Sequence, residues 1–264
     1  MFKLKKLCAK TDEKRRMGTE KILFSIIIPT LNEEKNIEPC LKSIIKQSNK
    51  NFEVLIMDGG SKDRTAEIVK KYGFNFINVP KKRPHDVSGA RNEGIRKSRG
   101  AYLFFLDADM LIEPNTLEVF KQEFMDKNVI GVCLKVLPFN GGKIEQAMYE
   151  FNNALALIAN WTRIYQLSYF SCHCYKREYV QHVKGFRNDL LSCEDMDLSL
   201  RLSKMGRFSV SHKAKIYASP RRIRQWSKVG YVAKYLKFLI QYYFLNNIND
   251  FYDDITDTVT DSIK

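Results

Sequence analysis

The sequence predicts an α/β protein with a mostly parallel sheet flanked by helices, and three observations lead to this fold class. Short β-branched apolar runs alternate with helical patterns from residue 23 to residue 106. The runs at 23–28 and 102–106 lack polar alternation, which is typical of strands buried on both faces. Acidic residues directly follow several of these runs, at the strand ends where ligands bind in such sheets.

Each element is predicted from its hydrophobic spacing and its bounding residues. We expect strands at 23–28, 52–57, 74–79, 102–106, 130–136 and 208–217, and helices at 37–45, around 66–69, and at 90–99, 143–170 and 229–245. Pro29 is expected to end the first strand, Ser61 to cap the second helix, and Gly100 to close the third. This order predicts one sheet with crossover helices.

The chain divides into four predicted regions. Residues 1–20 are a basic arm, 21–220 the main α/β domain, 221–249 a basic amphipathic helical segment and 250–264 an acidic tail. An apolar content of 44% argues against general disorder. No apolar stretch follows the basic start, so no cleavable signal peptide is expected. Six scattered cysteines favour reduced thiols and a cytoplasmic protein.

The formal net charge of +14 is concentrated late in the chain. Between residues 198 and 249 there are eleven Lys or Arg residues and no Asp or Glu. Such a block attracts substrate phosphates, nucleic acid or an acidic membrane surface, or is simply a solvated surface. Within it, the 229–245 helix has a polar stripe with Lys234 and Lys237, and either lies in a membrane interface or packs on the domain.

Carboxylates follow three of the predicted strands. Glu33 follows the first, Asp58 the second, and Asp107 and Asp109 the fourth. Two carboxylates separated by one small residue, Ala108, suit a Mg²⁺ or Mn²⁺ ion that is shared with a diphosphate. Neither G-x-x-x-x-G-K-[ST] nor G-x-G-x-x-G after a strand is present, so a phosphate-loop protein and a dinucleotide oxidoreductase are disfavoured.

Five stretches occur in an order and spacing that resemble a family 2 glycosyltransferase of the GT-A fold. They are residues 25–34 (SIIIPTLNEE), 57–65 (MDGGSKDRT), 89–94 (GARNEG), 105–109 (FLDAD) and 194–198 (EDMDL). The resemblance covers roughly residues 21–220, and only the combination of stretches is specific. It implies an inverting, metal-dependent transferase that uses a nucleotide-activated sugar.

The resemblance also implies a role for each matched position. Nucleotide-sugar contacts are implied for Pro29, Leu31, Glu33, Asp58, Arg91, Asp107 and Ala108, metal ligation for Asp107 and Asp109, and the general base for Asp195. A base facing the anomeric carbon and a cation on the leaving diphosphate are what an inverting transfer needs. An open alternative is that Asp195 only stabilises the start of a helix.

Three further features have a less specific meaning. The segment before Arg221 and Arg222 resembles one that follows the base in some non-processive members, and two guanidinium groups there would bind a phosphate. The processive pattern Q-x-x-R-W is not matched, which argues against processive polymer synthesis. His212 is a candidate metal ligand but is more often structural, and Cys172-His173-Cys174 is interpreted as structural.

These observations predict a glycosyltransferase with a UDP- or GDP-type donor and a hydroxyl or phosphate acceptor, with lipid-linked and glycan acceptors both open. The predicted location is cytoplasmic, with peripheral binding to an anionic membrane as an option, and nucleic acid is not expected as a partner because no such signature occurs. The alternatives are a sugar-1-phosphate nucleotidyltransferase, a nucleic-acid-binding protein and an inactive sugar-nucleotide binder. The nucleotidyltransferase is disfavoured because no Gly-rich, Arg-containing loop follows the first strand.

Overall fold

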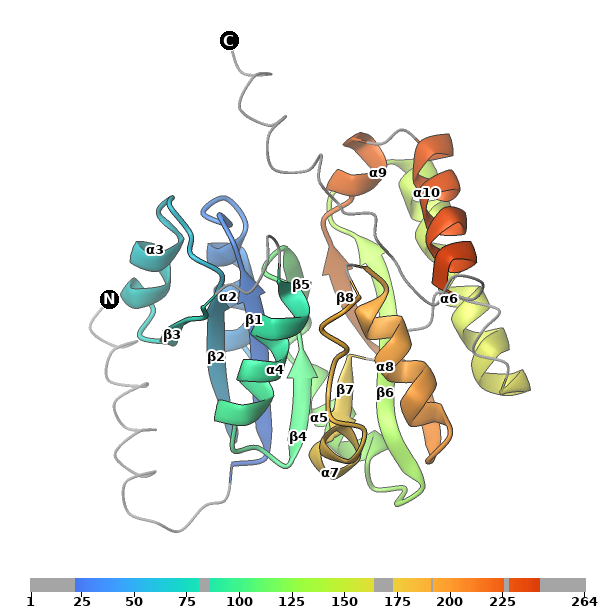
Figure 1. Cartoon of the computed structure of the whole chain (residues 1–264), viewed down its shortest axis with the longest axis horizontal. Helices are drawn as coiled ribbons and strands as arrows, with labels where there is room; N and C mark the ends of the chain where they lie inside the picture. The colour runs from blue at the N-terminus through green and yellow to red at the C-terminus, as the bar shows by residue number, and fades with distance from the viewer. Residues whose placement is uncertain (1–21, 81–85, 164–172, 191, 226–227, 243–264) are drawn as a thin grey trace.

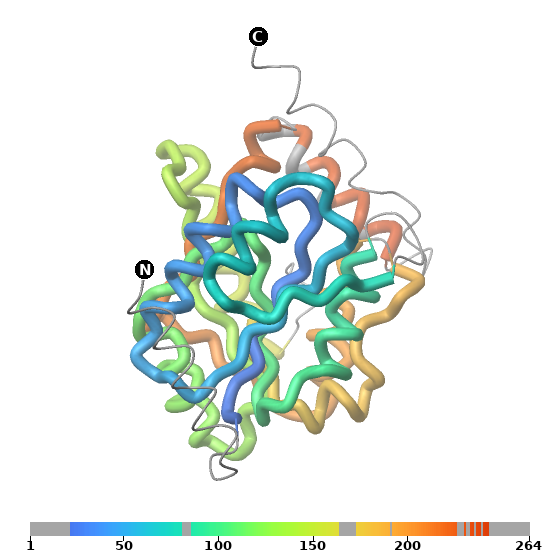
Figure 2. The backbone as a smooth tube through the Cα atoms, turned by 90° about the vertical axis from the view of Figure 1, so that its left-hand side faces the viewer, coloured from blue at the N-terminus to red at the C-terminus, as the bar shows by residue number. Residues whose placement is uncertain are grey.

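The computed structural model describes residues 22–80, 86–163, 173–190, 192–225 and 228–242 (Figure 1). The predicted basic arm and acidic tail therefore lie outside the described residues. Within the described part, an eight-stranded sheet has the order β3-β2-β1-β4-β7-β6-β8-β5. Helices cover both of its faces, as Figures 1 and 2 show. The predicted α/β class is confirmed.

The first half of the fold is the parallel part of the sheet. Its elements are β1 (Phe24–Thr30), α2 (Ile37–Ile45), β2 (Phe52–Asp58), α3 (Thr65–Lys71), β3 (Asn75–Asn78), α4 (Val87–Lys97) and β4 (Tyr102–Phe105). Strand β1 pairs in parallel with both β2 and β4, and β2 pairs in parallel with β3. Successive residues of β1 face opposite sides: Ile27 belongs to the apolar cluster with α4, and Ile26 to the cluster with α2.

The second half turns the sheet into a mixed one. Its elements are β5 (Met110–Ile112), α5 (Thr116–Glu123), β6 (Val129–Pro138), α6 (Lys143–Thr162), β7 (Cys174–Lys176), α7 (Arg177–His182), α8 (Glu194–Ser203), β8 (Arg207–Ala218), α9 (Arg221–Gln225) and α10 (Lys228–Ile240). Strand β7 lies antiparallel between β4 and β6, and β5 lies antiparallel to β8. Strands β5 and β7 were not predicted, because three residues are too few to show a hydrophobic period.

Two of the predicted boundary residues are wrong. Pro29 lies inside β1, beyond Ile27, where the pairing with β4 ends. Because no β4 residue pairs with Pro29, its lack of an N–H group breaks no hydrogen bond of the sheet on that side. Ser61 does not cap α3, which begins four residues later at Thr65. Its hydroxyl instead donates to the carboxylate of Asp58. The first difference extends β1 to Thr30, and the second lengthens the turn between β2 and α3.

Other boundaries move by a few residues. Helix α4 begins at Val87, because the carboxylate of Asp86 accepts the N–H of Gly89 as an N-cap, and it ends at Lys97. The helix predicted at 143–170 ends at Thr162, and residues 164–172 lie outside the described part. The helix predicted at 229–245 is described as far as residue 242.

Candidate active site

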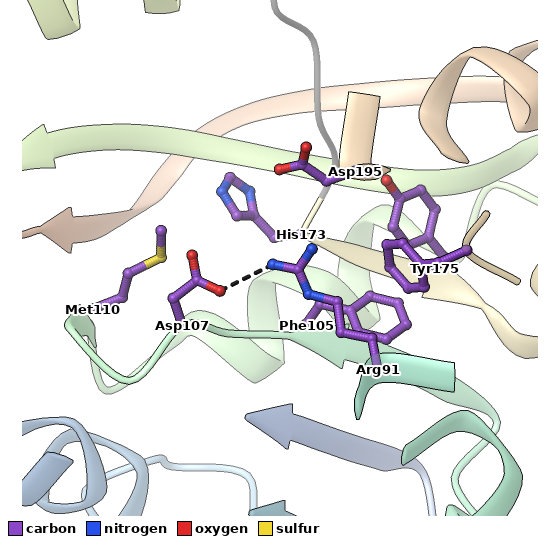
Figure 3. Close-up of a pocket in the computed structure, with 8 residues that line it drawn as sticks. Arg91, Phe105, Asp107, Met110, His173, Tyr175 and Asp195 are labelled. Atoms are coloured by element: carbon purple, nitrogen blue, oxygen red, sulfur yellow. Dashed lines mark hydrogen bonds and ion pairs between the residues drawn. The ribbon is translucent and has the colours of Figure 1, made fainter. Parts of the chain in front are cut away.

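The strand ends bring the predicted acidic residues to one edge of the sheet. Thr30 pairs with Asp58 at the ends of β1 and β2, and Ile27 of β1 pairs with Phe105, two residues before Asp107. A pocket opens at this edge, and Figure 3 shows its lining side chains. They are Arg91, Phe105, Asp107, Met110, His173, Tyr175, Phe186 and Asp195. The pocket therefore combines an acidic residue from the first half of the fold with one from the second half.

Arg91 joins these two halves. Its Nη2 atom lies 3.0 Å from Oδ1 of Asp107, and its Nη1 atom lies 2.8 Å from Oε1 of Glu194 (Figure 3 shows the first of these). Its guanidinium also sits 5.3 Å from the centre of the Phe186 ring. The Arg91 side chain is only 7% exposed, so its guanidinium is shielded from solvent, whereas the side chains of Asp107 and Glu194 are 33% and 14% exposed. It fixes the end of β4 against the start of α8, where Asp195 lies.

Burial and the two ion pairs shift the acid pKa values in different directions. Burial alone would raise the pKa of Asp107, but the nearby charges of Arg91 and Arg222 lower it below its usual range. Burial raises the pKa of Glu194 despite Arg91. Burial and the neighbouring charge of Asp107 also raise the pKa of Asp109. At neutral pH, cations therefore stabilise this carboxylate cluster.

One such cation is the side chain of Arg221, from the start of α9. Its Nη2 atom lies 2.9 Å from Oε1 of Glu33, and its Nε atom lies 3.2 Å from Oδ2 of Asp109. Unlike Arg91, it is 37% exposed. A guanidinium thus stands between the predicted metal ligand Asp109 and the predicted nucleotide contact Glu33.

The residues present fit a Mg²⁺ or Mn²⁺ ion. Asp107 and Asp109 offer carboxylate oxygens, the ligand type that these hard cations prefer. No group of three or more Asp, Glu, His or Cys side chains among the described residues is arranged as a complete metal site. Mg²⁺ in proteins is commonly held by one or two carboxylates together with water and substrate phosphates, and metal ligation by Asp107 and Asp109 stays a prediction.

Asp195 lies in the first turn of α8, and its side chain lines the pocket. Its Oδ1 atom accepts the N–H of the next residue, Met196, at 2.9 Å. The N-cap residue itself, Cys193, has a left-handed backbone and no capping side-chain bond. Asp195 therefore supports the helix start and also faces the pocket, so the base and capping interpretations remain compatible.

Asp197, two residues further along, is a structural acid. Its side chain is buried and accepts hydrogen bonds from Arg201 at 2.8 Å and from the hydroxyl of Tyr242 at 2.9 Å. These bonds tie α8 to the end of the chain's described part. The acidic cluster at the start of α8 thus divides into one residue that faces the pocket and one that holds the helix in place.

The other predicted site residues lie outside the pocket lining. The carboxylate of Asp58 is buried and accepts the N–H groups of Gly60 and Ser61 at 2.8 and 2.9 Å, so it organises the turn after β2. Outside the lining are also Pro29, Leu31, Glu33, Ala108, Asp109, Arg221 and Arg222, and of these Glu33, Asp109 and Arg221 form the second ion-pair cluster. Their nucleotide or metal roles stay predictions.

Sequence reasoning missed several lining residues, above all His173. From sequence, Cys172-His173-Cys174 is interpreted as structural because alternate residues of a strand face opposite sides and no second ligand pair accompanies it. The three-residue strand β7 shows no hydrophobic period that would place His173 at the carboxyl edge of the sheet. Glu194, the second partner of Arg91, lies in a matching stretch but has no predicted role of its own. His212, the other histidine considered, is exposed on β8 and does not line the pocket.

Comparison with known proteins agrees with this arrangement. The family model described as "Glycosyl transferase family 2" matches residues 25–193, which is more than half of the chain. The chain belongs to this family. A curated relative is the poly(ribitol-phosphate) beta-N-acetylglucosaminyltransferase TarS of Staphylococcus aureus, which is 32% identical over 208 residues, or 75% of the chain. Another is the glycosyltransferase AglE of Haloferax volcanii, 28% identical over 69% of the chain and 62% of AglE.

Solved structures show the same fold. The structure of S. aureus TarS residues 1–349 in complex with UDP-GlcNAc has a TM-score of 0.59 and 25% identity, and the match covers 75% of this chain and 58% of that one. The mannosyltransferase PcManGT of Pyrobaculum calidifontis, in complex with GDP-Man and Mn²⁺, has a TM-score of 0.60 at 20% identity, over 88% and 71% of the two chains. The present chain spans 36% of the length of the curated TarS protein. The GT-A fold class is therefore confirmed.

The described helices also bear on membrane insertion. None of those in the described part of the chain is long and apolar enough to cross a bilayer.

Proposed function

We propose that this protein is an inverting glycosyltransferase that moves a sugar from a UDP- or GDP-sugar to an acceptor hydroxyl or phosphate. The observation that carries the proposal is the double ion pair of Arg91, which holds Asp107 and the Glu194–Asp195 turn around one pocket. In this proposal Asp107 acts on the donor side of the pocket and Asp195 on the acceptor side. Family membership supports the donor class.

In the proposed reaction, Asp195 takes the proton of the acceptor hydroxyl. The acceptor oxygen forms a bond to the anomeric carbon while the bond from that carbon to the diphosphate oxygen breaks, and the diphosphate leaves with the electron pair. Attack and departure on opposite faces invert the anomeric centre. Asp107 and Asp109 would hold a Mg²⁺ or Mn²⁺ ion, which when bound supplies positive charge to the diphosphate. Arg221 and Arg222 would contact its phosphate oxygens.

A thermal-shift panel tests the donor class. The intact protein is heated with UDP-GlcNAc, GDP-mannose, UDP, GDP or free sugars, each with and without Mn²⁺. A true donor at a hundredfold excess over its dissociation constant should stabilise the fold by about 2.7 kcal/mol, more with Mn²⁺ than without. Free sugars are the negative control. If no nucleotide or nucleotide sugar shifts the melting temperature, or if the protein instead makes a nucleotide sugar from a nucleoside triphosphate and a sugar phosphate, the proposal fails.

We also propose that the enzyme binds peripherally to the anionic inner face of the cell membrane and acts there on a lipid-linked acceptor. The supporting feature is the outer side of α6, whose exposed apolar side chains recur every three or four residues. They are Ile144, Ala147, Phe151, Ala154, Ile158 and Trp161, the last 84% exposed. A continuous apolar stripe of this kind is unusual on a surface that stays in water.

Charge near the stripe favours a lipid surface over a protein partner. Both acidic residues of α6 are paired with cations, Glu145 with Arg224 and Glu150 with Lys135, so no unpaired acid of this helix would repel anionic lipid. Phe238 of α10 and Ala159 of α6 belong to the same apolar cluster. Basic residues next to such a surface add about 1 kcal/mol each.

Vesicle flotation distinguishes a lipid surface from a second copy of the chain as the binding partner of this stripe. The intact protein should float with phosphatidylglycerol vesicles at low salt and much less with phosphatidylcholine vesicles. Replacing Phe151 and Trp161 by Ser should reduce flotation at least about fivefold, since two large apolar side chains are removed from the interface. Met125→Ser, at an 80% exposed apolar residue just beyond α5, is the matched control and should float normally. A different outcome would contradict the membrane proposal: the wild-type protein does not float, light scattering shows that it is a dimer, and the double variant is a monomer. The stripe would then be the interface with a second copy of the chain.

A further inference from the structure

His173 lines the pocket, and neither the motifs nor the proposed mechanism gives it a role. It directly precedes β7, where its N–H donates to the carbonyl oxygen of Val132 at 3.0 Å and its carbonyl oxygen accepts the N–H of Phe105 at 2.9 Å. These two bonds join it to β6 and β4 at the carboxyl edge of the sheet. The backbone position of His173 is therefore fixed two residues from Asp107 in the adjoining segment.

The ring of His173 is held in one orientation. Its Nδ1 atom accepts the N–H of Leu134 at 3.2 Å, so in the neutral ring the hydrogen lies on Nε2. Burial lowers the pKa of the ring to about 4, consistent with that neutral form. Among the residues that the structure describes, Nε2 has no hydrogen-bond partner, and the half-buried His173 side chain lines the pocket. Because His173 lines the pocket, this N–H group is available to donate to an acceptor atom on a molecule that fills the pocket.

Figure 3 shows the ring between the carboxyl groups of Asp107 and Asp195. In the proposed reaction, which this inference assumes, the first carboxylate lies on the diphosphate side and the second on the acceptor side. The group between them is the transferred sugar. We propose that His173 Nε2–H donates a hydrogen bond to an oxygen atom of that sugar, a hydroxyl or an acyl carbonyl, and so helps to select the donor sugar.

Two substitutions separate this role from a structural one. His173→Asn places a carbonyl oxygen near the position of Nδ1, so it keeps an acceptor for Leu134 and removes the pocket donor. His173→Gln places an amide nitrogen near the position of Nε2, so it keeps the donor and loses the acceptor for Leu134. The two variants therefore remove opposite halves of the same ring.

The measurement is calorimetric binding of UDP-GlcNAc and UDP, or of GDP-mannose and GDP, whichever pair the wild-type protein binds. We expect His173→Asn to weaken nucleotide-sugar binding about threefold to tenfold, the effect of one hydrogen bond, with binding of the bare nucleotide unchanged. His173→Gln should keep most of the preference for the nucleotide sugar and melt at a lower temperature. Should the Gln variant fail to fold, the Asn variant alone decides, because it retains the Leu134 contact.

The inference is overturned if His173→Asn binds the nucleotide sugar as tightly as the wild type. It is equally overturned if the Asn and wild-type proteins behave alike and only the Gln variant loses the sugar preference, because the ring then serves only to hold Leu134. A wild-type protein that binds neither nucleotide nor nucleotide sugar is a different outcome, in which the proposed function itself fails.

Discussion

The site contains two arginines that each bridge two carboxylates, and they differ in exposure. Arg91 pairs with Asp107 and Glu194 while only 7% exposed, and its Nη atoms lie within 3.0 Å of both partners. Arg221 pairs with Glu33 and Asp109 while 37% exposed. The first pair of contacts joins two halves of the fold, whereas the second joins a short helix to the sheet edge.

This difference in burial implies a difference in function. Charges shielded from water are costly to separate, so Arg91 acts as a permanent part of the site that keeps the donor and acceptor sides together. A half-exposed ion pair contributes little to stability and exchanges readily, because water replaces the partners. We therefore expect the Arg221 contacts to give way when a divalent cation and a diphosphate enter, and the Arg91 contacts to persist.

The largest effect that follows from this comparison concerns Arg91. Replacing Arg91 by Met leaves the partly buried carboxylates of Asp107 and Glu194 without their cation, and we expect a loss of about 2 kcal/mol in unfolding free energy at pH 7. Urea denaturation measures it. Arg96→Met, on the exposed side of the same helix and paired with Glu93, is the control and should lose no more than about 0.5 kcal/mol.

The pH dependence of this variant has a definite sign. In the wild type the pKa of Asp107 is lowered, so its contribution is present above its unfolded-state pKa of 3.8 and is lost as pH falls. Without Arg91, the pKa of Asp107 loses the largest of the charges that lower it, and the pKa of Glu194, already raised by burial, rises further. The variant should then regain stability as pH is lowered from 7 to about 5, where these acids bind protons. Equal stability of both proteins at pH 7 would show that Arg91 is not a structural bridge.

The next effect concerns the metal. If Asp109 ligates the cation, Asp109→Asn should weaken nucleotide-sugar binding at least about tenfold in Mn²⁺ and hardly at all in EDTA, because only the metal-linked part of the affinity is lost. Calorimetry with and without EDTA measures both. Turnover of the wild type should stop in EDTA. Full activity in EDTA together with a normal Asp109→Asn variant would remove the metal from the account.

The two arginines also illustrate what sequence could and could not predict. Arg91 lies in a stretch that matched the family, and Asp107 follows a strand whose apolar run is plain in the sequence, so both were found. The contact of Arg91 with Glu194 was not predicted, because it joins residues 103 positions apart and depends on how the second half of the sheet folds back. His173 was missed for the same reason: its place follows from a three-residue strand inserted between β4 and β6, which only the tertiary pairing reveals.

The smallest effect concerns Arg221. Arg221→Gln should raise the affinity of the nucleotide-free protein for Mn²⁺ about fivefold. The substitution removes a competing cation whose ion pairs with Asp109 and Glu33 contribute roughly 1 kcal/mol. Titration calorimetry or manganese paramagnetic resonance measures it. Arg224→Gln, on the same helix but paired with Glu145, is the control and should leave the affinity unchanged. Unchanged or weaker Mn²⁺ binding by the Arg221 variant would mean that its guanidinium does not occupy the cation position.

The central claim is that two carboxylates on opposite sides of one pocket perform a sugar transfer, with Asp195 as the base. Its most direct test is Asp195→Asn, measured both as turnover and as affinity for the nucleotide sugar, with circular dichroism to check the fold. General-base contributions are typically about 10²–10⁴-fold, so the account predicts a loss of at least about a hundredfold in rate with donor affinity and fold unchanged. Near-normal turnover, or a variant that loses its fold along with its activity, would contradict it and leave Asp195 as a residue that stabilises the start of α8.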